Sequence, residues 1–132
     1  MTQSRYSLPR KKILRGKRAF EYIFEHGSSF REGVLKFVFC KPFPDELAQH
    51  PVSAGFSAPK KLLRKAVQRN RIKRCMREAY RLNQQLVTQP AGDVHVAFLV
   101  IYQRPQLLSF HRIEKDMVNG LKKLQAKLDE HP

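Results

Sequence analysis

The chain has 132 residues, of which 26 are lysine or arginine and 11 are aspartate or glutamate, giving a net charge of +15. This length fits a single domain over residues 1–132, and 42% apolar residues allow a modest core. No stretch has the roughly 20 apolar residues that span a bilayer, and the N-terminus lacks the apolar core of a signal peptide, so we expect a cytoplasmic protein without a membrane partner. The excess of positive charge favours a polyanionic partner.

The first part of the chain predicts an arm followed by a helix. Residues 1–10 carry basic side chains with little apolar pattern, and we expect a mobile basic arm. The helical spacing of Phe20 and Phe24 predicts a helix over residues 16–26, which ends at Gly27.

Two strands are predicted next. The β-branched and aromatic residues at 34–40 are typical of a strand. At 52–57 apolar residues alternate with Ser and Gly, which predicts a strand with one covered face. The proline-rich segment between them, residues 42–51, predicts a connecting loop, with an extra strand as the alternative.

The second half predicts a helix, a strand and a final helix. Apolar residues recur at helical spacing from 66 to about 85, and residues 94–102 are almost wholly apolar, as in a strand covered on both faces. Ser109 is placed to cap a last helix. The order α-β-β-α-β-α in one small domain predicts the α+β class, as a two-layer α/β sandwich.

The strongest signal is a basic block from Lys60 to Arg81, with ten lysine or arginine residues and a single acid, Glu78, for a net charge of +9. Helical spacing sets four of its cations one turn apart beside the apolar stripe: Arg69, Lys73, Arg77 and Arg81. Guanidinium groups bind phosphate oxygens in pairs, so the pattern indicates nucleic-acid binding without choosing between DNA and RNA. The alternative is a solvated helix face in which Glu78 pairs with Arg74 or Arg81.

The aromatic pair on the first helix has two interpretations. Phe20 and Phe24 can be core residues, which is the commoner fate of aromatic side chains at helical spacing. A ring left open can instead stack on an unpaired base, which is worth about 1–3 kcal/mol per base. Lys17 and Arg18 flank Phe20 and make the second interpretation more plausible.

Little in the sequence predicts catalysis by the protein itself. The chain has no glycine-rich phosphate loop and no nucleophile elbow, and its acids are too few to predict a two-metal nuclease. Cys40, Cys75 and the scattered histidines match no ligand spacing, so we expect reduced thiols, no metal site and no bound cofactor. A ribosome-associated or general RNA-binding protein and a stand-alone nuclease remain as alternatives.

Three segments resemble the protein subunit of bacterial ribonuclease P. They are Phe20-x-x-x-Phe24-x-His26-Gly27, Ser57-Ala58-Pro59-Lys60-Lys61 and Arg69-Asn70-Arg71-Ile72-Lys73-Arg74, the last continued by Arg77-Glu78-Ala79-Tyr80. The resemblance covers residues 8–128, with the family's domain expected at 16–128. It departs after Lys61, where the family commonly has a glycine and this chain has Leu62-Leu63-Arg64-Lys65.

The resemblance implies a sandwich with a left-handed βαβ crossover that carries the basic helix. It implies assembly with a catalytic RNA, which uses Mg²⁺ to remove the 5′ leader from precursor tRNA. The protein would bind that RNA and the leader and help to position the substrate. No catalytic residue, no metal and no protein partner is expected for the chain itself.

The resemblance also implies roles for particular residues, position by position. The RNA-binding residues of the signature helix would be Arg69, Asn70, Arg71, Lys73, Arg74 and Arg77. The adjacent loop would add Lys60 and Lys61. The leader-binding cleft would contain Phe20, Phe24 and Phe37.

Overall fold

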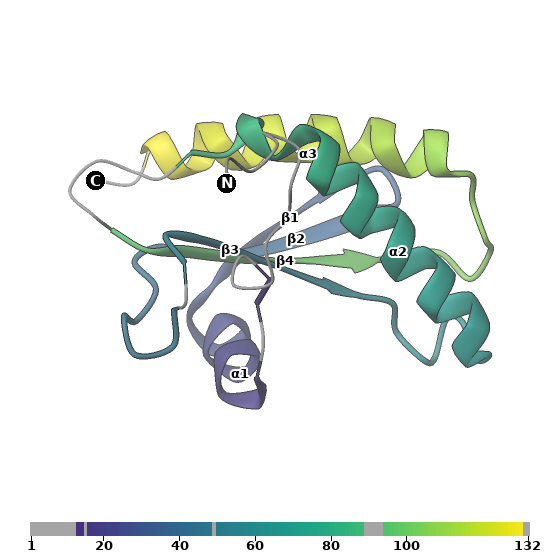
Figure 1. The fold of residues 1–132 in the computed structure, drawn as a ribbon, viewed down its shortest axis with the longest axis horizontal. Coiled ribbons are helices and arrows are strands. Elements are labelled where there is room, and N and C mark those ends of the chain that lie inside the picture. Colours follow the sequence, from purple (N-terminus) through teal and green to yellow (C-terminus); the bar gives the residue numbers. More distant parts are fainter. Residues whose placement is uncertain (1–12, 15, 49, 89–93, 131–132) are drawn as a thin grey trace, which may run out of the picture.

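The computed structural model describes residues 13–14, 16–48, 50–88 and 94–130 (Figure 1). The elements are α1 (Lys17–His26), β1 (Ser28–Glu32), β2 (Leu35–Cys40), β3 (Val52–Ser57), α2 (Ala66–Asn83), a short 3₁₀ helix (Gln84–Leu86), β4 (Val96–Tyr102) and α3 (Phe110–Glu130). The basic arm expected at residues 1–10 lies outside the described residues. The predicted α+β class is confirmed.

The strands form a four-stranded sheet in the order β1-β2-β4-β3. β1 and β2 form an antiparallel hairpin, and β4 pairs antiparallel with β2 but parallel with β3. Parallel neighbours need a crossover connection, and α2 supplies it between β3 and β4. The hand of that crossover stays a prediction of the resemblance.

The two faces of the sheet are covered unequally (Figure 1). α2 and α3 cover one face and bury the larger core, in which Phe37, Phe98 and Met117 are fully buried. The short α1 lies on the opposite face, where Ile23 packs with Leu99 in a smaller core. Because α1 is short, it covers only part of its face, and this uneven cover creates the candidate site.

The additional strand is β1, and it does not lie in the proline-rich segment where the alternative placed it. β1 pairs with β2 through a turn at Gly33, whose φ of +57° favours glycine. The buried Asp116 of α3 closes this turn, because its Oδ2 accepts the N–H of Val34 at 3.0 Å. The strand was missed because a partner 82 residues away in sequence stabilises it.

β3 also differs from its prediction, since both of its faces are covered. The sequence alternation suggested that Ser53 and Gly55 face solvent, yet both are buried. A Cβ at Gly55 would lie 3.1 Å from a ring carbon of Phe20 and 3.3 Å from Leu14. The alternation therefore reflects close approach of α1 and the preceding segment to this strand.

The predicted end of α1 at Gly27 and the predicted start of α3 after Ser109 are both confirmed. Gly27, however, does not serve as the usual left-handed glycine at a helix end. Its φ is −86°, outside the left-handed region, and its N–H donates to the carbonyl of Ile23 at 2.7 Å. A Cβ there would lie 2.8 Å from the carbonyl oxygen of Phe39, so close packing requires the glycine. At α3, the Ser109 hydroxyl accepts the N–H of Arg112 at 3.2 Å and caps the helix.

Candidate RNA-binding site

A cleft of about 300 Å³ lies between α1 and α2. Phe20 and Phe24 of α1 form one wall, and Lys73 of α2 lies on the other. Ser57 and Leu99 are among the residues that line it from the sheet, together with Phe56 and Ala58. The cleft thus combines aromatic rings with one cation, which is the composition that binds single-stranded nucleic acid through bases and phosphates.

The two aromatic rings of the cleft are exposed to different degrees. Phe20 is half-buried and packs against Gly55, so it contributes to the smaller core as well as to the cleft. Phe24 is 59% exposed, the largest exposed aromatic surface among the described residues. Phe24 is therefore the ring that is open for stacking on a base. Phe20 is at once a core residue and part of the cleft lining.

Phe37 does not line this cleft, and its assignment there was wrong. It is fully buried on the α3 side of the sheet and stacks with Phe30 at 5.1 Å between ring centroids. A Cβ at Gly120 of α3 would lie only 2.2 Å from its ring. Alternation along β2 puts its neighbours Lys36 and Val38 on the α1 side. A one-residue uncertainty in aligning a strand exchanges its two faces.

The floor of the cleft was not predicted. Ser57 and Leu99 come from the two parallel strands. Leu99 belongs to no motif of the sequence, and Ser57 begins the segment 57–61, of which only Lys60 and Lys61 were expected to bind RNA. The alternating Ser53, Gly55 and Ser57 mark the face of β3 that carries the floor of the cleft, but the alternation predicted that this face is exposed to solvent. Recognising that a second layer covers only part of it would have located the floor.

The cations of α2 point to two sides of the helix. Its buried side, which includes Ile72 and Met76, packs on the sheet. Lys73 lines the cleft with α1, whereas Arg71 and Arg74 line a second hollow of about 270 Å³ beside Phe110 of α3. Asn70 and Arg77 are exposed as well, and Arg77 lines a third hollow with Arg74 and Arg81. The predicted signature residues thus surround the exposed part of α2 and do not converge on one point.

Arg69 lies apart from the other signature cations because it holds the loop before α2. Its Nη1 donates to the carbonyl of Leu63 at 2.9 Å and to that of Arg64 at 2.8 Å. Leu63 is buried at 2% exposure and anchors this loop in the core. The segment that departs from the family pattern is therefore a turn held by the buried Leu63 and by Arg69, and it leaves Lys60 and Lys61 exposed after β3.

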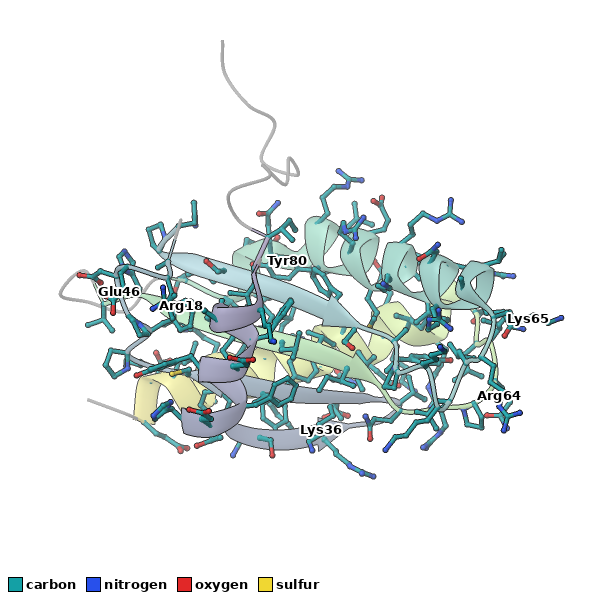
Figure 2. The ribbon with its side chains drawn as sticks, turned by 90° about the horizontal axis from the view of Figure 1, so that it is seen from below. Arg18, Lys36, Glu46, Arg64, Lys65 and Tyr80 are labelled. Atoms are coloured by element: carbon teal, nitrogen blue, oxygen red, sulfur yellow. The ribbon has the colours of Figure 1, made fainter. Side chains whose placement is uncertain are left out.

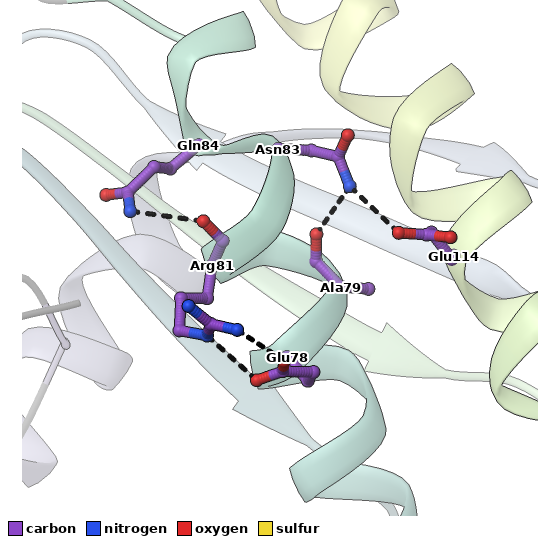
Figure 3. Close-up of polar contacts among 6 residues, drawn as sticks. All are labelled: Glu78, Ala79, Arg81, Asn83, Gln84 and Glu114. Carbon is purple, nitrogen blue, oxygen red and sulfur yellow. Dashed lines mark hydrogen bonds and ion pairs between the residues drawn. The ribbon is translucent and has the colours of Figure 1, made fainter. Parts of the chain in front are cut away.

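The only acid of the basic block pairs with Arg81 (Figure 3). Arg81 donates from Nε to Glu78 Oε2 at 2.9 Å and from Nη2 to Oε1 at 2.6 Å. This pairing selects one of the two partners that the sequence allowed. The hydrogen bonds from Arg81 lower the pKa of Glu78 below its ordinary value, so the carboxylate stays charged and occupied. Within the described chain, Arg74 and Arg77 form no ion pair and can bind phosphates.

Among the described residues, no three or more His, Cys, Asp or Glu side chains come together in a group that could hold a metal ion. In the same residues, no helix has the length and apolar character needed to cross a membrane. The buried Asp116 is engaged by Val34 and Arg112 and belongs to the fold.

A sandwich with a cationic helix beside an aromatic cleft defines a class of nucleic-acid-binding protein, and comparison with known proteins identifies the family. The Ribonuclease P family model matches residues 8–125. The ribonuclease P protein component of Chlorobaculum tepidum is 38% identical over 127 residues, covering 89% of this chain and 82% of that protein. That of Nitrosomonas eutropha is 39% identical over 87 residues, covering 65% and 69%.

Solved structures agree with these sequence matches. The RNase P protein of Thermotoga maritima superposes with a TM-score of 0.66 at 25% identity, covering 83% of this chain and 94% of that one. The Staphylococcus aureus RNase P protein gives a TM-score of 0.68 at 23% identity, covering 86% and 95%, and supports the fold.

The chain belongs to the family of ribonuclease P protein components. In bacteria these proteins are subunits of the ribonuclease P holoenzyme and work with its RNA subunit in processing the 5′ leader of tRNA. The interpretation as a ribonuclease P subunit is therefore confirmed over the general RNA-binding protein and the stand-alone nuclease.

Proposed function

We propose that this subunit holds the 5′ leader of precursor tRNA in the cleft between α1 and α2, while the outer side of α2 binds the RNA subunit. The observation that carries the proposal is the cleft itself, which is lined by the exposed Phe24 of α1 and by Lys73 of α2. The two activities occupy different sides of one helix, so both RNAs can be bound at once.

The chemistry of the cleft suits a strand of variable sequence. Every base has a π-face, so stacking on Phe24 does not require a particular base. Lys73 contributes a point charge that holds a phosphate without reading sequence. A leader bound in this way gives the holoenzyme a preference for precursor over mature tRNA, since mature tRNA has no strand to place in the cleft.

The outer side of α2 suits the backbone of a structured RNA. Arg71 and Arg74 lie beside Phe110 in a shallow hollow, and Arg77 lies one turn further along the helix. Their guanidinium groups are in no ion pair within the described residues and present paired donors to phosphate oxygens. Lys60 and Lys61 extend this positive surface at the end of β3.

Hydrolysis itself is assigned to the RNA subunit with Mg²⁺. The chain's contribution is electrostatic: it neutralises phosphates of two RNAs that otherwise repel each other, and so it lowers the Mg²⁺ needed for assembly. The cytoplasm, where bacterial transcripts are made and processed, is the location that this proposal requires.

Reconstitution tests the proposal. A bacterial ribonuclease P RNA is incubated with precursor tRNA at limiting Mg²⁺, with and without the protein, and leader removal is followed. The proposal predicts faster cleavage with the protein, none by protein alone, and tighter binding of precursor than of mature tRNA. Equal binding of the two substrates by the assembled holoenzyme would show that the cleft does not hold the leader.

A further inference from the structure

A row of four residues crosses the sheet just beyond the cleft and contains two cations that belong to no sequence motif. Strand register aligns Arg31 of β1 with Lys36 of β2, Lys36 with Ile101 of β4, and Ile101 with Ser57 of β3. Ser57 is part of the cleft lining. The row therefore runs from the cleft across the full width of the sheet to the opposite edge.

The contacts of neighbouring residues fix the face on which this row lies. Phe30 and Glu32, on either side of Arg31, both contact α3, through Lys127 and Lys123. Side chains alternate along a strand, so Arg31 faces the α1 side.

The same reasoning applies to the neighbouring strands. Lys36 lies between Leu35 and Phe37, which are both in the larger core, and Ile101 packs with the smaller core below α1. All four positions of the row thus share the face that carries the cleft.

The cationic part of the row, Arg31 and Lys36, lies beyond the part of the sheet that α1 covers. α1 covers the preceding row, in which Val38 and Leu99 belong to the smaller core. Arg31 is exposed and Lys36 half-buried, and neither forms an ion pair with any described carboxylate. Figure 2, seen from the α1 side, shows Lys36 between α1 and the end of the molecule that carries Arg64 and Lys65.

The spacing matches a strand that continues out of the cleft. Adjacent strands lie about 4.8 Å apart, so Lys36 is about 10 Å and Arg31 about 15 Å from Ser57 along the row. These distances are within the reach of a few nucleotides of an extended strand. Ile101 lies between the cleft and the cations as an apolar step on which a base or sugar can rest.

We infer that Arg31 and Lys36 bind leader phosphates beyond the nucleotides held in the cleft, so that they extend the leader track across β4, β2 and β1. The inference rests on the proposed leader binding in the cleft. Both cations act by positioning the strand, since they lie on a face of the sheet with no catalytic group. Longer leaders should therefore gain affinity that short leaders cannot.

The test compares charge removal on the track with charge removal elsewhere. Holoenzyme containing the R31S/K36Q double variant is titrated with precursor tRNAs whose leaders grow one nucleotide at a time, and with mature tRNA. The matched control is K115Q/K122Q, which removes two exposed charges from α3 in the opposite layer. The swap R31K/K36R keeps both charges and should restore binding.

The expected result is a loss confined to long leaders. Loss of two phosphate contacts makes the slope of log K against log salt concentration shallower by about 1.4. Between 50 and 200 mM salt, wild type should therefore lose about sevenfold more affinity for long leaders than the double variant does. Short-leader precursor and mature tRNA should bind R31S/K36Q and wild type alike, as should all substrates with the control.

Three results would overturn the inference. An unchanged dependence on leader length would show that the row is an ordinary solvated surface. An equal loss for mature tRNA would assign the two cations to the RNA subunit or the tRNA body. A wild-type holoenzyme with no leader preference would remove the proposed leader cleft, and the extended track with it.

Discussion

Truncation of Phe24 separates RNA binding from folding more cleanly than any other change in the cleft. Its side chain is 59% exposed, so Phe24→Ala should change the free energy of unfolding by only about 0.5 kcal/mol, as for other surface substitutions. Loss of one stacked base costs about 1–3 kcal/mol. At 1.4 kcal/mol per factor of ten, the affinity for leader-bearing tRNA should fall by about 5-fold to 150-fold.

The assay measures dissociation constants of reconstituted holoenzyme for precursor and mature tRNA, together with urea unfolding of the free protein. Phe24→Leu keeps an apolar side chain but removes the π-face, so it should lose most of the same preference. Leu107→Ala is the control, because Leu107 is also an exposed apolar residue at 37% exposure and lies outside the lining of the cleft.

Two outcomes would refute this reasoning. A precursor preference that survives Phe24→Ala would mean that no base stacks on this ring. A loss of stability of about 3–5 kcal/mol, as for truncation of a buried phenylalanine, would mean that the ring belongs to the core. Phe20→Ala should show both effects in smaller measure, since Phe20 is half-buried against Gly55.

Three further changes probe the basic helix and the core. Replacing Arg74 and Arg77 by Ala should weaken binding to the RNA subunit and lower its salt slope by about one unit per lost phosphate contact; an unchanged slope would contradict their role. Gly120→Ala should destabilise the fold by about 1–3 kcal/mol in urea unfolding, because its Cβ would lie 2.2 Å from a buried ring of β2; wild-type stability would contradict this packing. NMR titration should find the pKa of Glu78 below that of an ordinary glutamate, and Arg81→Ala should raise it. The small stabilisation from the Glu78–Arg81 pair is fully present above the ordinary pKa of glutamate, and it is lost as the pH falls through the lowered pKa of Glu78. An unshifted pKa of Glu78 would mean that the pair does not persist in solution.

The elements that local pattern determines were predicted closely. α2 has an apolar stripe at helical spacing and β4 is an almost wholly apolar run, and their observed bounds, Ala66–Asn83 and Val96–Tyr102, fall within two residues of expectation. Ser109 caps α3 through its own hydroxyl, an interaction within four residues of sequence. Such features need no knowledge of the rest of the fold.

The features that failed depend on distant parts of the chain. β1 needs Asp116 of α3 to close its turn, and Phe37 faces α3 because the hairpin register puts it there. The sequence of β2 does not predict which of its two faces lies on the side of the sheet that carries the cleft. Helical spacing was enough to put Lys73 on the polar side of α2, but its position on the cleft was not predicted, and the floor of the cleft comes from two strands that meet only in the folded sheet.

The most direct test of the account is crosslinking of the leader to the protein in assembled holoenzyme. A photoreactive nucleotide is placed at successive leader positions, and the crosslinked peptides are identified by mass spectrometry. The account predicts crosslinks to α1 around Phe24 and to α2 around Lys73, moving toward Lys36 as the probe moves along the leader. Crosslinks confined to α3, on the opposite face of the sheet, would contradict it.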